Sequence, residues 1–144
     1  MKTKLLQESP EKTYAVIFST GDEVRSGLLA FAKKHHLGGS HFTAIGAFSD
    51  AALGYFDWER KMYHTIPIRE QVEVLSFMGD IALKENGEPE VHAHVVVGKA
   101  DGTTRGGHLL EAHVRPTLEV IVVESPVHLR RKFDPESQLA LIHL

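Results

Sequence analysis

The sequence contains no cysteine in its 144 residues, which excludes disulfides, thiolate metal ligands and cysteine nucleophiles. A long apolar run is also missing from its start. Met1 to Lys12 is polar, so neither a signal peptide nor a membrane helix is expected there. The cytoplasm is therefore the default location, and we expect no membrane partner.

The chain also has no excess of positive charge. The formal net charge is −3, and the dense basic run is limited to Arg130, Arg131 and Lys132. Such a short basic run is typical of a solvated surface, and the chain lacks the positive field that draws proteins to nucleic acid. Several enzyme motifs are absent too, because there is no GxSxG elbow, Walker loop, HExxH or strand-linked GxGxxG.

The remaining composition is that of an ordinary globular protein. Apolar residues make up 42% of the chain and charged residues 24%. This content supports one hydrophobic core in a chain of this length, and no repeat or linker divides the sequence. We therefore expect a single domain over residues 1–144.

One helix is indicated near the start. Tyr14 to Ser19 is a short, β-branched apolar run typical of a buried strand, and acidic residues follow it. Val24, Leu28 and Phe31 then recur at helical spacing, and the glycine pair that begins at Gly38 ends the segment. The pattern predicts a strand followed by a helix.

After that helix the apolar pattern changes to the alternation typical of strands. The segments that show it are Phe42–Ile45, Ala51–Phe56, Lys61–Ile68, Gln71–Ala82, Val91–Lys99, Thr103–Leu110, Thr117–Glu124 and Leu139–Leu144. Turn residues separate them, among them Gly46, Ser49-Asp50 and Arg115-Pro116. One early helix followed by strands predicts an α+β fold, with a mostly antiparallel sheet and one main flanking helix.

Histidine is unusually frequent, with ten in the chain, and two of them stand in the segment Val91-His92-Ala93-His94. Side chains two apart on a strand project from the same face, so His92 and His94 can converge on one metal ion. The remaining histidines of the chain, apart from His108, are interpreted as structural or solvated: His35, His36, His41, His64, His113, His128 and His143.

His108 is the candidate third ligand, and its position depends on the hairpin loop. A two-residue loop, Asp101-Gly102, would place His108 opposite Val95 and on the wrong face. A three-residue loop that adds Ala100, with Gly102 in the left-handed conformation of a G1 bulge, would place His108 opposite His94. A bulge at Gly106-Gly107 would be another way to correct the register.

Glu111 follows His108 by three residues and is the nearest candidate to bind or orient a ligand at the metal. If the chain turns there, its carboxylate would serve as a fourth ligand or a general base; on a continuing strand it would face away as a surface glutamate. Three histidines would leave one coordination position open, as catalytic zinc sites do.

Longer runs of the sequence resemble the plants-and-prokaryotes conserved (PPC) domain in its stand-alone prokaryotic form. The resemblance covers the chain from Tyr14 to about Arg131. It is carried by Phe42–Asp57 (FTAIGAFSDAALGYFD), Arg69–Leu83 (REQVEVLSFMGDIAL) and His92–Val123, within which His92–His94, Gly106–Leu110 and Pro116–Val120 are the most specific parts.

The resemblance implies a homotrimer and, as in some prokaryotic members, a zinc ion held by His92, His94 and His108. In plants the domain accompanies AT-hook motifs of nuclear DNA-binding proteins, but this sequence has no Arg-Gly-Arg-Pro hook. We therefore expect a binding and assembly module in gene regulation. The alternatives are a zinc-dependent enzyme acting on a small molecule, and a protein that binds DNA directly.

Overall fold

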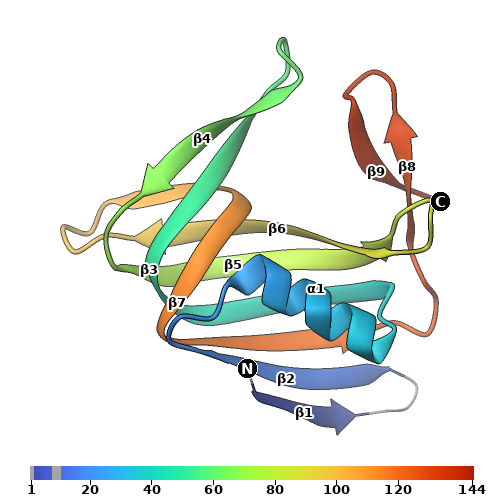
Figure 1. Ribbon diagram of the computed structural model, residues 1–144, viewed down its shortest axis with the longest axis horizontal. Coiled ribbons are helices and arrows are strands. Elements are labelled where there is room, and N and C mark those ends of the chain that lie inside the picture. The colour runs from blue at the N-terminus through green and yellow to red at the C-terminus, as the bar shows by residue number, and fades with distance from the viewer. Residues whose placement is uncertain (1, 8–10) are drawn as a thin grey trace.

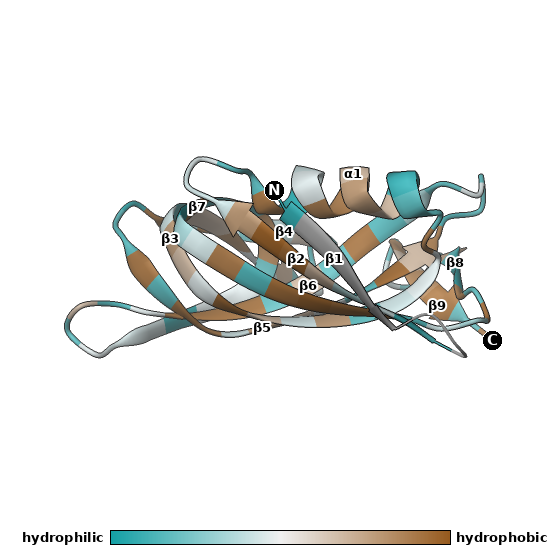
Figure 2. Cartoon of the chain, turned by 90° about the horizontal axis from the view of Figure 1, so that it is seen from below, coloured by the Kyte–Doolittle hydropathy of each residue, from teal (hydrophilic) through white to brown (hydrophobic). Residues whose placement is uncertain are grey.

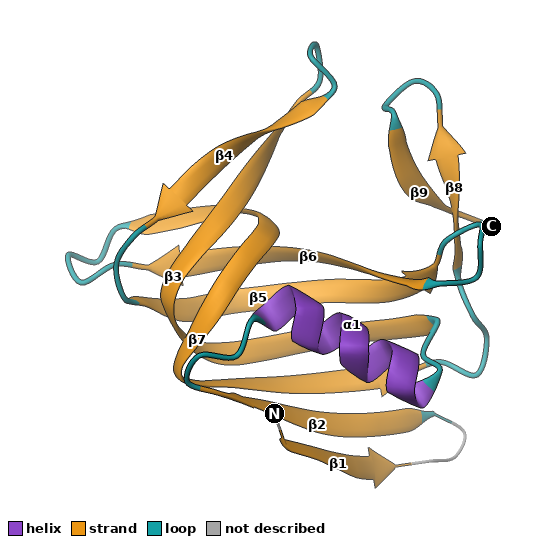
Figure 3. Ribbon diagram, in the orientation of Figure 1, coloured by secondary structure: helices purple, strands orange, loops and turns teal. Residues whose placement is uncertain are grey.

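The computed structural model describes residues 2–7 and 11–144, which form one α-helix and nine β-strands (Figure 1; Figure 3). The helix is α1 (Val24–His35), and the strands are β1 (Lys2–Gln7), β2 (Lys12–Ser19), β3 (Gly39–Asp57), β4 (Met62–Ile68), β5 (Val72–Leu83), β6 (Pro89–Gly98), β7 (Thr104–Glu124), β8 (Arg130–Asp134) and β9 (Leu139–His143). The expected α+β class is confirmed.

The strands form a mainly antiparallel sheet in the order β1-β2-β7-β3-β5-β8-β9. In addition, β4 pairs with β3, and β6 pairs with both β5 and β7. Because β3 also pairs with β5 and β7, these four long strands form a closed circuit of hydrogen-bonded neighbours. The β3–β4 and β8–β9 hairpins project from the body of the sheet on the same side (Figure 1).

Helix α1 lies against one face of the sheet, and apolar and polar residues alternate along the strands beneath it (Figure 2). The carboxylate of Glu23 caps the helix by accepting hydrogen bonds from the first backbone amides, and His36 ends it in the left-handed conformation with φ of 55°. A side chain at Gly27 would collide with the ring of Phe18, so this glycine allows the helix to approach β2 closely. The residues that α1 buries are Val24, Leu28, Phe31 and Ala32.

Two strands are much longer than the sequence indicates. The predicted turns at Gly46 and Ser49-Asp50 lie inside β3, and the one at Arg115-Pro116 lies inside β7. Each of these positions coincides with a shift in the β3–β7 register, so the strands bend at bulges and continue. Gly46 is required there because a β-carbon on it would meet the carbonyl oxygen of Thr117.

The two ends of the chain also differ from expectation. Residues Lys2–Gln7, for which no element was expected, pair with β2 as strand β1. The basic run Arg130 to Lys132 was expected to be solvated, and this was wrong for Arg131, which is only 5% exposed. Alternation along β8 turns this side chain inward while its neighbours stay exposed.

The described part of the chain contains no helix that is long and apolar enough to cross a membrane.

Candidate metal centre

The hairpin between β6 and β7 decides where His108 lies. Its loop is the three-residue alternative: the amide of Lys99 donates to the carbonyl of Thr103 at 2.8 Å, and the amide of Gly102 donates to Lys99 at 2.9 Å. Gly102 has a φ of 80°, as the G1 bulge requires. His108 therefore faces His94 directly, and the register from there to the loop has no shift, so a bulge at Gly106-Gly107 is not used.

The three predicted ligands come together in the fold. One ring nitrogen from each of His92, His94 and His108 lies within 4.8 Å of the others. The ring centroids are 5.1 Å apart for His92 and His94, 5.1 Å for His92 and His108, and 5.6 Å for His94 and His108. Within the part of the chain that the structure describes, this is the one group of three or more such side chains close enough to share a metal ion.

His108 offers a buried ring nitrogen to a metal ion. Its Nδ1 atom is buried and has no hydrogen-bond partner among the described residues. Burial, followed by the positive charges of His92, His94, Arg25 and Arg131, lowers its pKa to about 4. The ring is therefore neutral at pH 7 and keeps a lone pair that none of the described residues uses, which is the state a metal ligand needs.

His94 has the same electrostatic character. Burial, followed by the charge of His92, lowers the pKa of His94 below its usual value of 6.5. Protonation of either ring would therefore not compete with metal binding near neutral pH. The three imidazoles fit a divalent metal ion of the kind that nitrogen ligands prefer.

A tyrosine forms one wall of the site. Tyr63 of β4 stacks on His108, with ring centroids 4.8 Å apart and planes 28° apart. Gly54, the β3 partner of His108, makes room for that ring, because a β-carbon there would lie 2.7 Å from Cδ1 of Tyr63. Burial raises the pKa of the Tyr63 hydroxyl, so it stays protonated at neutral pH.

The carboxylate of Asp80 lies close to the ring of His92. Asp80 is paired with His92 on the adjacent strand, and its Oδ2 lies 3.6 Å from Nδ1 of that ring. Its Oδ1 is bound by the guanidinium of Arg131. Burial raises the pKa of Asp80, but His92 and Arg131 together outweigh it and hold that pKa below its usual value. Asp80 is therefore ionised and can fix the orientation of the histidine.

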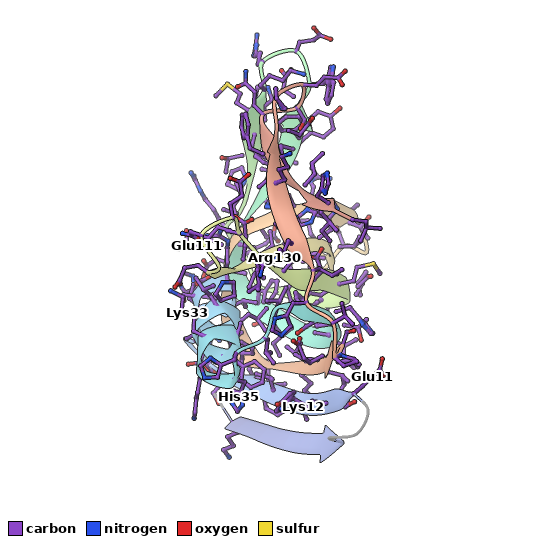
Figure 4. The ribbon with its side chains drawn as sticks, turned by 90° about the vertical axis from the view of Figure 1, so that its right-hand side faces the viewer. Glu11, Lys12, Lys33, His35, Glu111 and Arg130 are labelled. Atoms are coloured by element: carbon purple, nitrogen blue, oxygen red, sulfur yellow. The ribbon has the colours of Figure 1, made fainter. Side chains whose placement is uncertain are left out.

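Glu111 lies outside this group. Its carboxylate is 3.8 Å from Nε2 of His113, which is itself bound through Nδ1 to Asp50 at 2.8 Å. Figure 4 shows Glu111 on the side of the molecule that α1 occupies. Its role in orienting a ligand at the metal stays a prediction.

Two of the other histidines make ring contacts or a hydrogen bond away from this group. His35 packs with Tyr14 and Phe31, and His64 binds Asp57 at 3.0 Å.

The residues near the site that the sequence analysis did not predict are Arg25, Tyr63, Asp80 and Arg131. Only Asp80 carried a usable signal, since a β5–β6 hairpin closed at Asn86-Gly87 could have placed it beside His92.

The chain is similar to known proteins in both sequence and structure. A model of the Plants and Prokaryotes Conserved (PCC) domain matches residues 6–126. A plant- and prokaryote-conserved (PPC) protein from Pyrococcus horikoshii has a similar structure, with a TM-score of 0.85 and 32% identity, and the match covers 99% of this chain and 95% of that one.

Two further solved structures are similar over most of their length. A metal-containing protein from Archaeoglobus fulgidus has a TM-score of 0.85 and 30% identity, covering 99% of this chain and 97% of that one. A candidate DNA-binding protein from Ralstonia eutropha JMP134 has a TM-score of 0.84 and 35% identity, covering 91% and 90%.

Among curated proteins, the bifunctional protein GlmU of two Synechococcus strains is 27% identical over 137 residues. That match covers 92% of this chain and 20% of each relative, so the chain spans about a fifth of their length.

Proposed function

Because the chain belongs to the Plants and Prokaryotes Conserved (PCC) domain family, we propose that it is a homotrimeric, zinc-binding PPC-domain protein acting as a binding and assembly module. We also propose that residues 1–144 form one domain. The protein would work in the cytoplasm and take part in gene regulation. The observation that carries it is the convergence of His92, His94 and His108 within 4.8 Å, together with the unpartnered buried nitrogen of His108.

Zinc is the metal that this ligand set favours. Three imidazoles without a thiolate or a carboxylate suit a tetrahedral ion whose fourth position is open to water or to a ligand. The likeness to the metal-containing Archaeoglobus fulgidus protein supports a metal without identifying it. Zinc and magnesium should be titrated separately into chelator-treated protein. Saturation near one zinc per chain with no magnesium uptake is expected, and the absence of saturable zinc binding would refute the proposal.

The trimer is supported by an apolar surface on the sheet. Five exposed side chains come from the adjacent strands β3, β5, β6 and β7: Ile45, Leu75, Met78, Val96 and Ile121. Helix α1 lies over the other face (Figure 2), so no element in the described part of the chain covers this one. Met78 pairs with His94, so the apolar surface borders the metal site. A neighbouring subunit bound to this surface would therefore cover one side of the metal site.

An enzymatic role is the second candidate, and the open coordination position favours it. A zinc-bound water has a pKa of roughly 7, so it can act as a nucleophile at neutral pH. We propose Glu111 as the residue that would orient a ligand there. A hydrolase screen with and without chelator separates this role from a pure assembly module, because a chelator-sensitive turnover reduced in Glu111→Gln would require an enzyme.

Direct DNA binding is the third candidate, favoured by the likeness to the Ralstonia eutropha protein. The net charge of −3 weighs against it. Electrophoretic mobility shift at two salt concentrations tests it, since phosphate contacts weaken steeply with salt. We expect no shift of short AT-rich duplexes at micromolar protein, and a salt-sensitive shift would assign the regulatory role to direct contact with DNA.

A further inference from the structure

A cavity of about 190 Å³ opens beside the histidine site. It is bounded by side chains from α1, β4, β6, β7, β8 and β9, including His92 and His108 themselves. The polar groups that join them are Arg25, Tyr63, Glu90 and Arg131. A ligand held at the metal would therefore extend into a space whose nearest donors are two guanidinium groups and a phenol.

The two arginines differ in how their charges are matched. Arg131 is buried and already neutralised, since it binds Asp80 and lies 3.6 Å from Glu90. Arg25 projects from the first turn of α1, is exposed, and has no ion-pair partner among the described residues. The two guanidinium groups are matched in number by the carboxylates of Asp80 and Glu90, so the charge of a bound metal ion would be the excess charge at the cavity. With the metal ion bound, the cavity would therefore be a positive site within an acidic chain.

The guanidinium group of Arg131 is buried at the edge of the cavity. The Nε atom of Arg131 is buried and makes no hydrogen bond among the described residues, because Oε2 of Glu90 lies 3.6 Å from it, beyond hydrogen-bond distance. A buried guanidinium N–H without an acceptor costs free energy, and a bound oxyanion would supply the acceptor. The phenol of Tyr63 is a further donor in the same wall.

We propose that this cavity binds the carboxylate or phosphate group of a small organic molecule, held jointly by the metal ion and Arg25. This inference rests on the proposed metal site and names the class of ligand that the site takes. Apolar side chains of Val91, Leu139 and Leu141 line another part of the cavity, so the ligand carries a short hydrocarbon portion. Its size is that of a small metabolite, because pockets for drug-sized ligands measure roughly 300–1,000 Å³.

Cobalt-substituted protein gives a direct test, because the visible spectrum of protein-bound cobalt reports on its coordination. Inorganic phosphate and acetate should be titrated separately into the cobalt-loaded chain after free cobalt has been removed. We expect a saturable spectral change with at least one of the two anions. Tighter binding of phosphate would assign a phosphoryl ligand, and tighter binding of acetate a carboxylate.

Arg25→Gln is the decisive variant, and Arg69→Gln is its control, because Arg69 is also exposed but lies outside the cavity. We expect both variants to bind cobalt at the wild-type ratio. The anion dissociation constant should rise about tenfold or more in Arg25→Gln, the loss typical of a charge-assisted hydrogen bond. It should not change in Arg69→Gln.

The possible failures are distinct. If the wild type takes up no cobalt or zinc, the metal site itself fails and the anion site falls with it. If cobalt binds but neither anion alters the spectrum, or Arg25→Gln binds the anions as tightly as wild type, only the anion site is refuted.

Discussion

The Oδ2 atom of Asp80 lies 3.6 Å from Nδ1 of His92, at paired positions of β5 and β6. A carboxylate in this position holds the ring of a metal-binding histidine and selects which nitrogen carries the proton. Removing its charge should therefore weaken the metal site without removing a ligand. Asp80→Asn is expected to lower zinc affinity about 10- to 100-fold, measured by competition with a chromophoric chelator.

Asp57→Asn is the matched control for this change. Asp57 binds His64 at 3.0 Å, which makes it an Asp–His pair that contributes nothing to the histidine group. Equal losses of zinc affinity in the two variants would mean that Asp80 acts through general stability alone.

The loop of the β6–β7 hairpin should be sensitive to a side chain at Gly102. Its φ of 80° is a conformation that alanine adopts only with strain, whereas asparagine tolerates it. Gly102→Ala is expected to lower the free energy of unfolding by about 1–2 kcal/mol in urea titrations. Gly102→Asn should lose clearly less. Equal losses would show that the loop does not depend on the left-handed residue.

The Asp50–His113 pair predicts a pH dependence of stability. The hydrogen bond to Asp50 is the largest influence and raises the pKa of His113 above its usual 6.5, although burial opposes it. The folded state therefore favours the protonated ring. The stabilisation is fully present below the unfolded pKa and is lost as pH rises through the higher folded value.

The free energy of unfolding of wild type and His113→Gln should accordingly differ more at about pH 5.5 than at about pH 8.5. Because the side chains of His113 and Asp50 are 36% and 49% exposed, the change in that difference should stay below about 1 kcal/mol. A difference that grows with pH would contradict the raised pKa.

The apolar surface on the sheet should hold the oligomer together. Leu75 is 56% exposed in the single chain, and a glutamate there would place an unpaired charge inside an interface. Leu75→Glu is expected to convert a trimer of about 48 kDa, three times 16.0 kDa, into monomers when measured by light scattering.

Val127→Glu is the control for the oligomer, because Val127 is 69% exposed in a loop away from this surface. It should leave the trimer intact. A wild-type mass of 16.0 kDa at micromolar concentration would refute the assembly altogether.

The part of the site built by local rules could be predicted from the sequence. His92 and His94 follow from strand periodicity, and the position of His108 follows from the loop closed by Gly102. Even here the sequence allowed two loops, and only the hydrogen bonds between Lys99 and its neighbours decide between them.

The surroundings of the site depend on long-range packing, which local patterns do not encode. Arg131 reaches Asp80 across 51 positions of sequence, and its burial contradicts its place in a basic run. Gly46 and Pro116 are ordinary turn residues in sequence, yet both lie within bulges of continuous strands. Residues of these types mark bends as well as chain reversals, and only the neighbouring strand settles which.

The metal site is tested most directly by the zinc content of three purified proteins: wild type, His94→Ala and His143→Ala. His143 is an exposed histidine of β9 outside the group of three, so it controls for loss of any histidine. After zinc supplementation and dialysis, elemental analysis should find close to one zinc per chain in wild type and in His143→Ala. It should find far less than one in His94→Ala. Full zinc content in His94→Ala, or wild type that stays free of metal, would contradict the site.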